Sequence, residues 1–139
     1  MVEKKPKAVV ASGKRKTSVA RASFKEGSGR VMINDVPLDF YQPEYSRLKI
    51  RESLIIAGDL AQKADIKIAV RGGGIVSQSD AIRQSIAKGM VDFFNNKDLK
   101  KVYADYDRNL LVYDARRTEP HKPSRSRKGA RRHKQKSKR

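Results

Sequence analysis

The charged residues are distributed very unevenly along the chain, and this distribution constrains the fold more than any other sequence feature. Residues 1–21 hold seven basic and one acidic residue, residues 22–114 hold 14 basic and 13 acidic, and residues 115–139 hold 12 basic and one acidic. The middle segment carries 42 hydrophobic residues, whereas the last segment carries only two, both alanine. Only the middle can bury a core. The sequence therefore predicts one globular domain over residues 1–114, with a basic N-terminal segment, followed by a basic tail over residues 115–139.

The net charge of +18 indicates a polyanionic partner. The chain has no cysteine, which excludes a disulfide framework, a zinc ribbon and a thiol nucleophile. It has no apolar run long enough to span a membrane, and no apolar segment of signal-peptide type follows its charged start. We therefore expect a cytoplasmic protein with no membrane partner and no tendency to form homo-oligomers.

The residues that enzymes commonly use are scarce in this sequence. The only histidines, His121 and His133, lie in the tail among like charges that disfavour a metal cation. The triple glycine Gly72-Gly73-Gly74 lacks the continuation of a P-loop or of a dinucleotide-binding motif. We expect no enzymatic activity, no catalytic residue, no metal site and no cofactor.

Glycines and alternating residues predict strands in the first third of the chain. Residues 12–16 predict a basic loop, and residues 17–24 and 30–33 predict two strands of a hairpin. Residues 25–29 supply its turn, because their two glycines tolerate positive φ. We expect an antiparallel meander that continues to about residue 40.

Helical and strand periodicities alternate in the rest of the domain. Residues 43–58 predict a helix with Tyr45, Leu48 and Ile55 on its apolar stripe, and residues 65–71 predict a half-buried strand. A second helix is predicted over residues 79–94, with Ser77 and Asp80 as a capping box and with Ile82, Ile86, Met90 and Phe93 on one face. Residues 99–106 predict a short helix, and residues 110–113 a last strand.

Three basic groups are candidates for phosphate contact. The first is the run at residues 14–16 with Arg21, and the second is Arg71 with the triple glycine before a helix. For the second group, a tight turn that packs on its own fold is an equally good interpretation, and the two are compatible. The third group is the tail. The candidate RNA-binding residues are Lys14, Arg15, Lys16, Arg21, Arg71, Gly72, Gly73, Gly74, Arg116, Arg117, Lys122, Arg125, Arg127, Lys128, Arg131 and Arg132.

The tail has the composition of a segment that is disordered when free. Pro120 and Pro123 favour an extended path at its start, and 25 extended residues reach about 80 Å. It contains no aromatic residue, so phosphate contacts rather than base stacking should dominate its binding.

Several segments resemble a known protein family. These are SGKRKTSVAR at residues 12–21, RLKIRE at 47–52, GGGIVSQ at 72–78 with AKGM at 87–90, and the basic tail. Together they resemble the family of the universal small-subunit ribosomal protein nine, in its archaeal or eukaryotic-type branch. The triple-glycine motif before a helix is the specific part of this resemblance, which covers nearly the whole chain.

The resemblance implies a single α+β domain with a mixed sheet, helices packed on it and a left-handed β-α-β crossover, as in the second domain of small-subunit ribosomal protein five. It also implies binding to the 3′ major domain of 16S-type rRNA in the head of the small subunit, beside neighbouring head proteins. The tail would reach the decoding region, where Lys136, Lys138 and Arg139 would contact P-site tRNA. Lys134 and Lys138 replace aromatic residues that are usual there, which favours an electrostatic contact.

Two other classes of function remain open from the residues alone. A non-ribosomal architectural nucleic-acid-binding protein would have the same charge distribution. An enzyme on the same fold would need an acid–base or nucleotide site that the sequence does not display.

Overall fold

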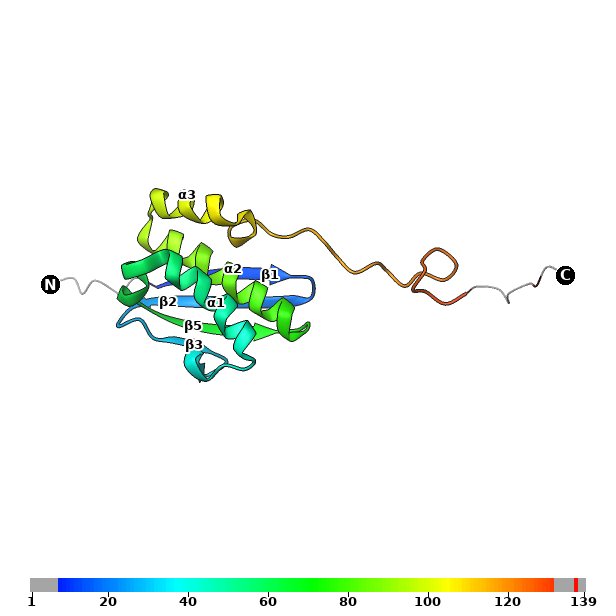
Figure 1. The fold of residues 1–139 in the computed structure, drawn as a ribbon, viewed down its shortest axis with the longest axis horizontal. Coiled ribbons are helices and arrows are strands. Elements are labelled where there is room, and N and C mark those ends of the chain that lie inside the picture. Colours follow the sequence, from blue (N-terminus) through cyan, green and yellow to red (C-terminus); the bar gives the residue numbers. More distant parts are fainter. Residues whose placement is uncertain (1–7, 132–136, 138–139) are drawn as a thin grey trace.

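The computed structural model describes residues 8–131 and Ser137. It contains a five-stranded mixed sheet in the order β1-β2-β5-β3-β4, with helices packed on one of its faces (Figure 1). The strands are β1 (Val9–Arg15), β2 (Ser18–Glu26), β3 (Val31–Ile33), β4 (Val36–Pro37) and β5 (Ala64–Arg71), and the α-helices are α1 (Glu44–Ala57), α2 (Ile75–Phe94) and α3 (Lys97–Tyr106). The predicted α+β architecture with a mixed sheet is thus confirmed.

The hairpin of this sheet differs from the predicted one. β1 and β2 pair antiparallel around a two-residue turn, with Arg15 opposite Ser18, so residues 12–15 belong to a strand and not to a loop. β2 and β3 are not neighbours, because β5 lies between them, antiparallel to β2 and parallel to β3. The expected meander is therefore wrong. The glycines at residues 27–29 turn the chain, but a strand from much later in the sequence takes the adjacent position.

The connection from β3 through α1 to β5 joins two parallel neighbours and crosses the helix-covered face (Figure 1). With the helices toward the viewer and both strands running left to right, β5 lies above β3, which makes the crossover left-handed. Nearly all such connections in proteins are right-handed. This unusual crossover, implied by the family resemblance, is present.

The core lies between the sheet and α2. Ile66, Ile68 and Val70 of β5 are buried on the helix side, as their alternation predicts. The predicted face of α2 is also confirmed, because Ile82, Ile86, Met90 and Phe93 are all buried.

Two glycines let the layers approach closely. A Cβ on Gly13 of β1 would lie 2.1 Å from the backbone oxygen of Ala81 in α2, and one on Gly89 would lie 1.9 Å from the Phe24 ring. Gly13 is therefore a packing residue, and α2 lies almost directly on β1.

Helix α1 buries a different face from the predicted one. Tyr45, Leu48 and Ile55 are exposed, Ile55 by 75%. The side chains that α1 buries are those of Ser46, Ile50, Ser53 and Ala57. Small residues let α1 pack closely against its neighbours, and the Ser53 hydroxyl donates to the Ile50 carbonyl oxygen at 2.9 Å within the helix. A stripe made largely of serine and alanine is invisible to hydrophobic periodicity.

The ends of the later helices also differ from expectation. α2 begins at Ile75 with Gly74 as its N-cap and without a side-chain cap, so Ser77 and Asp80 lie inside the helix and form no capping box. Helix α3 begins at Lys97, capped by the Asn96 side chain, and buries Leu99 and Tyr103.

Residues 110–113 do not form the predicted strand. Arg108–Leu110 is a 3-10 turn, and residues 112–120 have no regular structure. Leu110 is fully buried, so this apolar run anchors the end of the domain without pairing to the sheet. None of the helices within the described ranges combines the length and apolar character that a bilayer crossing requires.

The described part of the tail leaves the domain as an extended strand-like segment and then closes into a small loop (Figure 1). The Ser124 N–H donates to the Ala130 carbonyl oxygen at 3.0 Å, and a Cβ on Gly129 would lie 2.4 Å from the Lys122 carbonyl oxygen. The tail over residues 122–130 is thus more compact than the extended path that its prolines predict.

Candidate nucleic-acid interface

One face of the sheet is left open by the helices, and it carries several of the predicted RNA-binding residues. The register places Lys14, Val19 and Arg71 in one row across β1, β2 and β5, and Arg21 lies in the next row beside Ala69. All of these alternate with the buried residues of their strands. Residues that are 57 positions apart in the sequence thus form one basic surface.

A shallow depression on this open face is lined by Val19, Arg21, Ala69 and Arg71. None of these lining residues is acidic, and neither Arg21 nor Arg71 forms an ion pair with any described residue. Two guanidinium groups beside an apolar floor can contact consecutive phosphates of a nucleic-acid strand. Lys16, at the turn after β1, is also exposed.

The triple glycine forms the turn between β5 and α2, at the same end of the sheet as Arg71. Gly72 and Gly73 have φ of 79° and 67°. The Gly72 carbonyl oxygen accepts hydrogen bonds from Ser18 Oγ at 2.9 Å and from Gln78 Nε2 at 3.1 Å. A Cβ on Gly73 would lie 2.0 Å from Ser18 Oγ. These contacts support the interpretation of a tight turn that packs on its own fold.

The same turn leaves Gly74 and the start of α2 open. Gly74 has no neighbouring atom within 4 Å of a would-be Cβ, and the first turn of α2 contains no acidic residue. Contact between a phosphate and this helix start remains a prediction.

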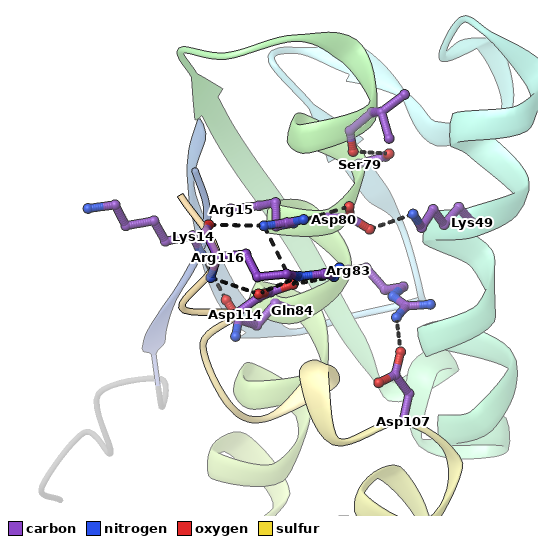
Figure 2. A network of polar contacts seen from close by, with 11 residues as sticks. Lys14, Arg15, Lys49, Ser79, Asp80, Arg83, Gln84, Asp107, Asp114 and Arg116 are labelled. Carbon is purple, nitrogen blue, oxygen red and sulfur yellow. Dashed lines mark hydrogen bonds and ion pairs between the residues drawn. The ribbon is translucent and has the colours of Figure 1, made fainter. Parts of the chain in front are cut away.

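Arg15 lies on the helix side of β1, apart from the other predicted cations. It belongs to an ion-pair cluster made of Arg15, Lys49, Asp80, Asp114 and Arg116 (Figure 2). Arg15 Nη1 lies 3.5 Å from Asp114 Oδ2 and donates to the Arg116 carbonyl oxygen at 3.3 Å. Lys49 Nζ lies 2.6 Å from Asp80 Oδ1. The Arg15 side chain is only 16% exposed, so its guanidinium holds the base of the tail against the domain.

The Lys14 side chain points to the opposite face of the sheet from Arg15, because neighbouring residues of a strand alternate between its two faces. Its side chain points away from the ion-pair cluster in Figure 2. Beside the cluster, Arg83 of α2 pairs with both Glu52 of α1 and Asp107 after α3. Arg83 thus links α1, α2 and the residue after α3 through ion pairs.

We predict an unusually low titration midpoint for Asp114. Its carboxylate accepts hydrogen bonds from the Arg116 side chain and backbone N–H, which lower its pKa from 3.8 to about 2. A lowered pKa means that this contact stabilises the fold above about pH 4 and is lost as the pH falls through about 2. A carbon-13 carboxyl titration should show this midpoint, and Arg116→Gln should raise it toward the ordinary value.

Asp65 is the control for that titration. Backbone N–H groups of Arg30 and Ser28 hold its pKa below the ordinary value, and neither depends on Arg116. Its midpoint should therefore stay low in Arg116→Gln. A midpoint near 4 for Asp114 in the unmodified protein would contradict the role assigned to Arg116.

The tail cations within the described residues are all exposed. Arg117 lies over the Tyr113 ring, with its guanidinium carbon 5.7 Å from the ring centroid. The exposed cations farther along are Lys122, Arg125, Arg127, Lys128 and Arg131. The predicted contacts of Arg132, Lys136, Lys138 and Arg139 lie outside the described residues.

The structure thus brings Lys14, Arg21 and Arg71 together on one face and assigns Arg15 to the ion-pair cluster. Sequence reasoning missed Lys88 and Gln84 of α2, which lie at the edge of β1 beside Lys14. No sequence pattern distinguishes them from other helix residues, because their position depends on how β1, α2 and the tail base pack together. Within residues 8–131 and at position 137, no group of acidic or histidine side chains could hold a metal ion.

A two-layer α+β domain with one open basic sheet face and a basic tail is typical of proteins that bind polyanions. Comparison with known proteins gives the family. Residues 13–139 match the model of the family Ribosomal protein S9/S16. The chain therefore belongs to this family of ribosomal proteins, which favours the ribosomal interpretation over the architectural and enzymatic alternatives.

Archaeal relatives match along most of the chain. The "Small ribosomal subunit protein uS9" of Methanococcus maripaludis strain S2 is 52% identical over 131 residues, which are 94% of this chain and 98% of that protein. The protein of the same name from Methanococcus vannielii is 48% identical over 131 residues, again 94% of this chain and 98% of that protein. That of Desulfurococcus amylolyticus is 52% identical over 118 residues, 85% of this chain and 84% of its own length.

Proposed function

We propose that this protein is a structural constituent of the small ribosomal subunit and binds 16S-type rRNA in the 3′ major domain of the subunit head. It works in translation on cytoplasmic ribosomes, beside neighbouring head proteins and without catalysing a reaction. The single observation that carries this proposal is the open sheet face, where Lys14, Arg21 and Arg71 have no acidic partner among the described residues. The names of the archaeal relatives support the assignment to the small subunit.

The geometry suits a flat docking onto the RNA backbone. The C-terminal ends of β1 and β5 lie at the same end of the sheet, because both strands run antiparallel to β2. Lys14, Arg71 and the open helix start at Gly74 therefore lie at that end together. The tail base reaches the same region, because Tyr113 and Arg117 border the hollow that also contacts Lys14. Sheet face and tail would bind one RNA region as a continuous basic surface.

We propose that the tail continues this surface away from the domain. Its exposed cations from Arg116 to Arg131 would neutralise phosphates where rRNA helices converge, and Arg132 would extend the same contact. The last cations, Lys136, Lys138 and Arg139, would contact the anticodon stem-loop of P-site tRNA. This assignment rests on the family resemblance and on the basic composition of the end.

The double variant Arg21→Gln with Arg71→Gln tests the sheet-face contact. It should bind a transcript of the rRNA 3′ major domain about tenfold more weakly, because each lost phosphate contact removes a salt-dependent share of affinity. The slope of log affinity against log salt should become shallower by about 0.7 to 0.9 for each contact. Filter binding at several salt concentrations measures both quantities.

The matched control for this experiment is Lys97→Gln with Lys100→Gln on α3. It removes the same charge from exposed positions away from the sheet. Equal losses in the two double variants would show that only net charge matters and would refute a specific face.

A further inference from the structure

A hollow of about 290 Å³ opens where the free edge of β1 meets α2 and the base of the tail. We call it the Gln84 hollow. Ser12, Gly13 and Lys14 of β1 line it together with Val19 of β2, Gln84 and Lys88 of α2, and Tyr113 and Arg117 of the tail base. The hollow therefore exists only because the β1-β2 hairpin, α2 and the tail base, which are remote in sequence, come together.

Gln84 lines this hollow, and its side chain has a hydrogen-bond donor without a partner among the described residues. Gln84 is 2% exposed, and its Oε1 accepts the Lys14 backbone N–H at 2.8 Å. That bond fixes which end of the amide is the oxygen, because a backbone N–H needs an acceptor. The Nε2 group is therefore the free end, and it is buried without a hydrogen-bond partner anywhere in the described part of the chain. Buried donors in native proteins are almost always paired, so this one calls for an external acceptor.

A second unpaired group lines the same hollow. The Tyr113 hydroxyl is also buried without a hydrogen-bond partner among the described residues. A phenolic hydroxyl can donate to an anion, as the amide Nε2 can. Two of the four buried side-chain polar atoms that lack a partner in the described structure thus line one hollow.

The charge around the Gln84 hollow specifies the acceptor. Lys14, Lys88 and Arg117 all line it, no acidic residue does, and none of the three forms an ion pair with a described residue. The cations of the neighbouring ion-pair cluster differ from these three, because they form ion pairs with Asp80 and Asp114. A water molecule could satisfy the two donors, but it would leave three positive charges uncompensated.

We propose that the Gln84 hollow is a binding site for one phosphate of the RNA backbone. Gln84 Nε2 and Tyr113 Oη, which are closed to solvent in the free protein, would turn toward its non-bridging oxygens and donate to them, and Lys14, Lys88 and Arg117 would compensate its charge. The proposal rests on the proposed function, which it deepens by naming a phosphate site beside the open sheet face. It makes the base of the tail part of the RNA site, because Tyr113 and Arg117 belong to both.

Two substitutions remove donors from the site with little change of shape. Tyr113→Phe deletes only the hydroxyl, and Gln84→Glu keeps an acceptor for the Lys14 N–H while replacing the free donor with a carboxylate oxygen. Each should weaken binding of the rRNA 3′ major-domain transcript, Tyr113→Phe by about threefold and Gln84→Glu by at least tenfold. A buried carboxylate could also lower the melting temperature. If Gln84→Glu does not fold, the RNA affinity of Tyr113→Phe decides the test.

The cation Lys88 provides a test with a matched control. Lys88→Gln should make the salt slope of RNA binding shallower by about 0.7 to 0.9, the amount expected for one phosphate contact. Lys100→Gln removes the same charge from an exposed position on α3 and should leave the slope unchanged. Equal slopes in these two variants would overturn the site.

A nitrogen-15 spectrum of the protein identifies the source of the phosphate. The side-chain amide signal of Gln84 should shift when the RNA transcript is added, and the shift should be absent in Lys88→Gln. A shift with inorganic phosphate but none with RNA would overturn the assignment to an RNA phosphate. If the transcript does not bind the unmodified protein at all, the proposed function fails. If it binds but neither the Gln84 signal nor the variants respond, only this site fails.

Discussion

Replacing Gly13 with alanine is expected to lower the free energy of unfolding by about 3 kcal/mol, because the new methyl group would overlap two backbone atoms of α2. A Cβ at this position would lie 2.1 Å from the Ala81 oxygen and 2.7 Å from the Ser85 nitrogen. Backbone atoms inside a helix cannot move aside as a flexible side chain can, so β1 and α2 must separate. Urea denaturation followed by circular dichroism measures the loss.

Gly74→Ala is the matched control for this stability measurement. It makes the same change of residue, but a Cβ there meets no atom within 4 Å and the φ of −101° suits any residue. Its effect should stay within about 0.5 kcal/mol. If Gly13→Ala is as stable as Gly74→Ala, the close contact between β1 and α2 is not a requirement of the fold.

Removing residues 115–139 is expected to have the largest effect on RNA binding. The tail carries 12 of the 33 basic residues and only one acidic residue. If even half of these cations contact phosphates, the truncated protein should bind the rRNA transcript about a thousandfold more weakly near physiological salt. The salt slope should become correspondingly shallow. An unchanged slope would refute the electrostatic account of the tail.

Two further measurements separate the tail's contributions. The melting temperature of the truncated protein should stay close to that of the full chain, because truncation after Asp114 retains the Arg15–Asp114 ion pair and the buried Leu110. Removal of residues 136–139 alone should weaken P-site tRNA binding to isolated small subunits while leaving subunit assembly intact. Normal tRNA affinity in that variant would contradict the proposed tRNA contact.

The sequence predicted those strands and helices whose hydrophobic pattern can be recognised without knowing which elements they pack against. β5 alternates strictly, and the face of α2 with Ile82 and Ile86 is apolar at helical spacing, so both could be recognised locally. The buried face of α1 could not be recognised, because Ser46 and Ser53 are polar by type and are buried by close packing. A polar contact of this face also joins residues that are distant in sequence. Tyr103 Oη, 50 positions after Ser53, donates to the Ser53 carbonyl oxygen at 2.7 Å.

The candidate site shows the same division. Charge counting selected Lys14, Arg21 and Arg71, which the structure places on one open sheet face; their contact with phosphate stays a prediction. Charge counting could not show that neighbouring side chains in the run at residues 14–16 point to opposite faces of the sheet. Strand alternation turns Arg15 toward Asp80 and Asp114, and Lys14 away from them. This alternation exists because residues 12–15 form a strand, whereas a loop, as the sequence predicts there, has no such alternation. The Gln84 hollow was beyond prediction, because Gln84 and Tyr113 are 29 positions apart with no spacing rule between them.

The two edges of the sheet have a consequence for the free protein. An exposed strand edge invites pairing with another chain, which is a route to aggregation. At one edge, β4 is only two residues long and includes Pro37, which has no N–H to offer. At the other, the Lys14 N–H of β1 is already bonded to Gln84, and the tail base lies alongside. The short β4 and the Lys14–Gln84 hydrogen bond therefore reduce the number of backbone groups through which the free protein could pair with another copy.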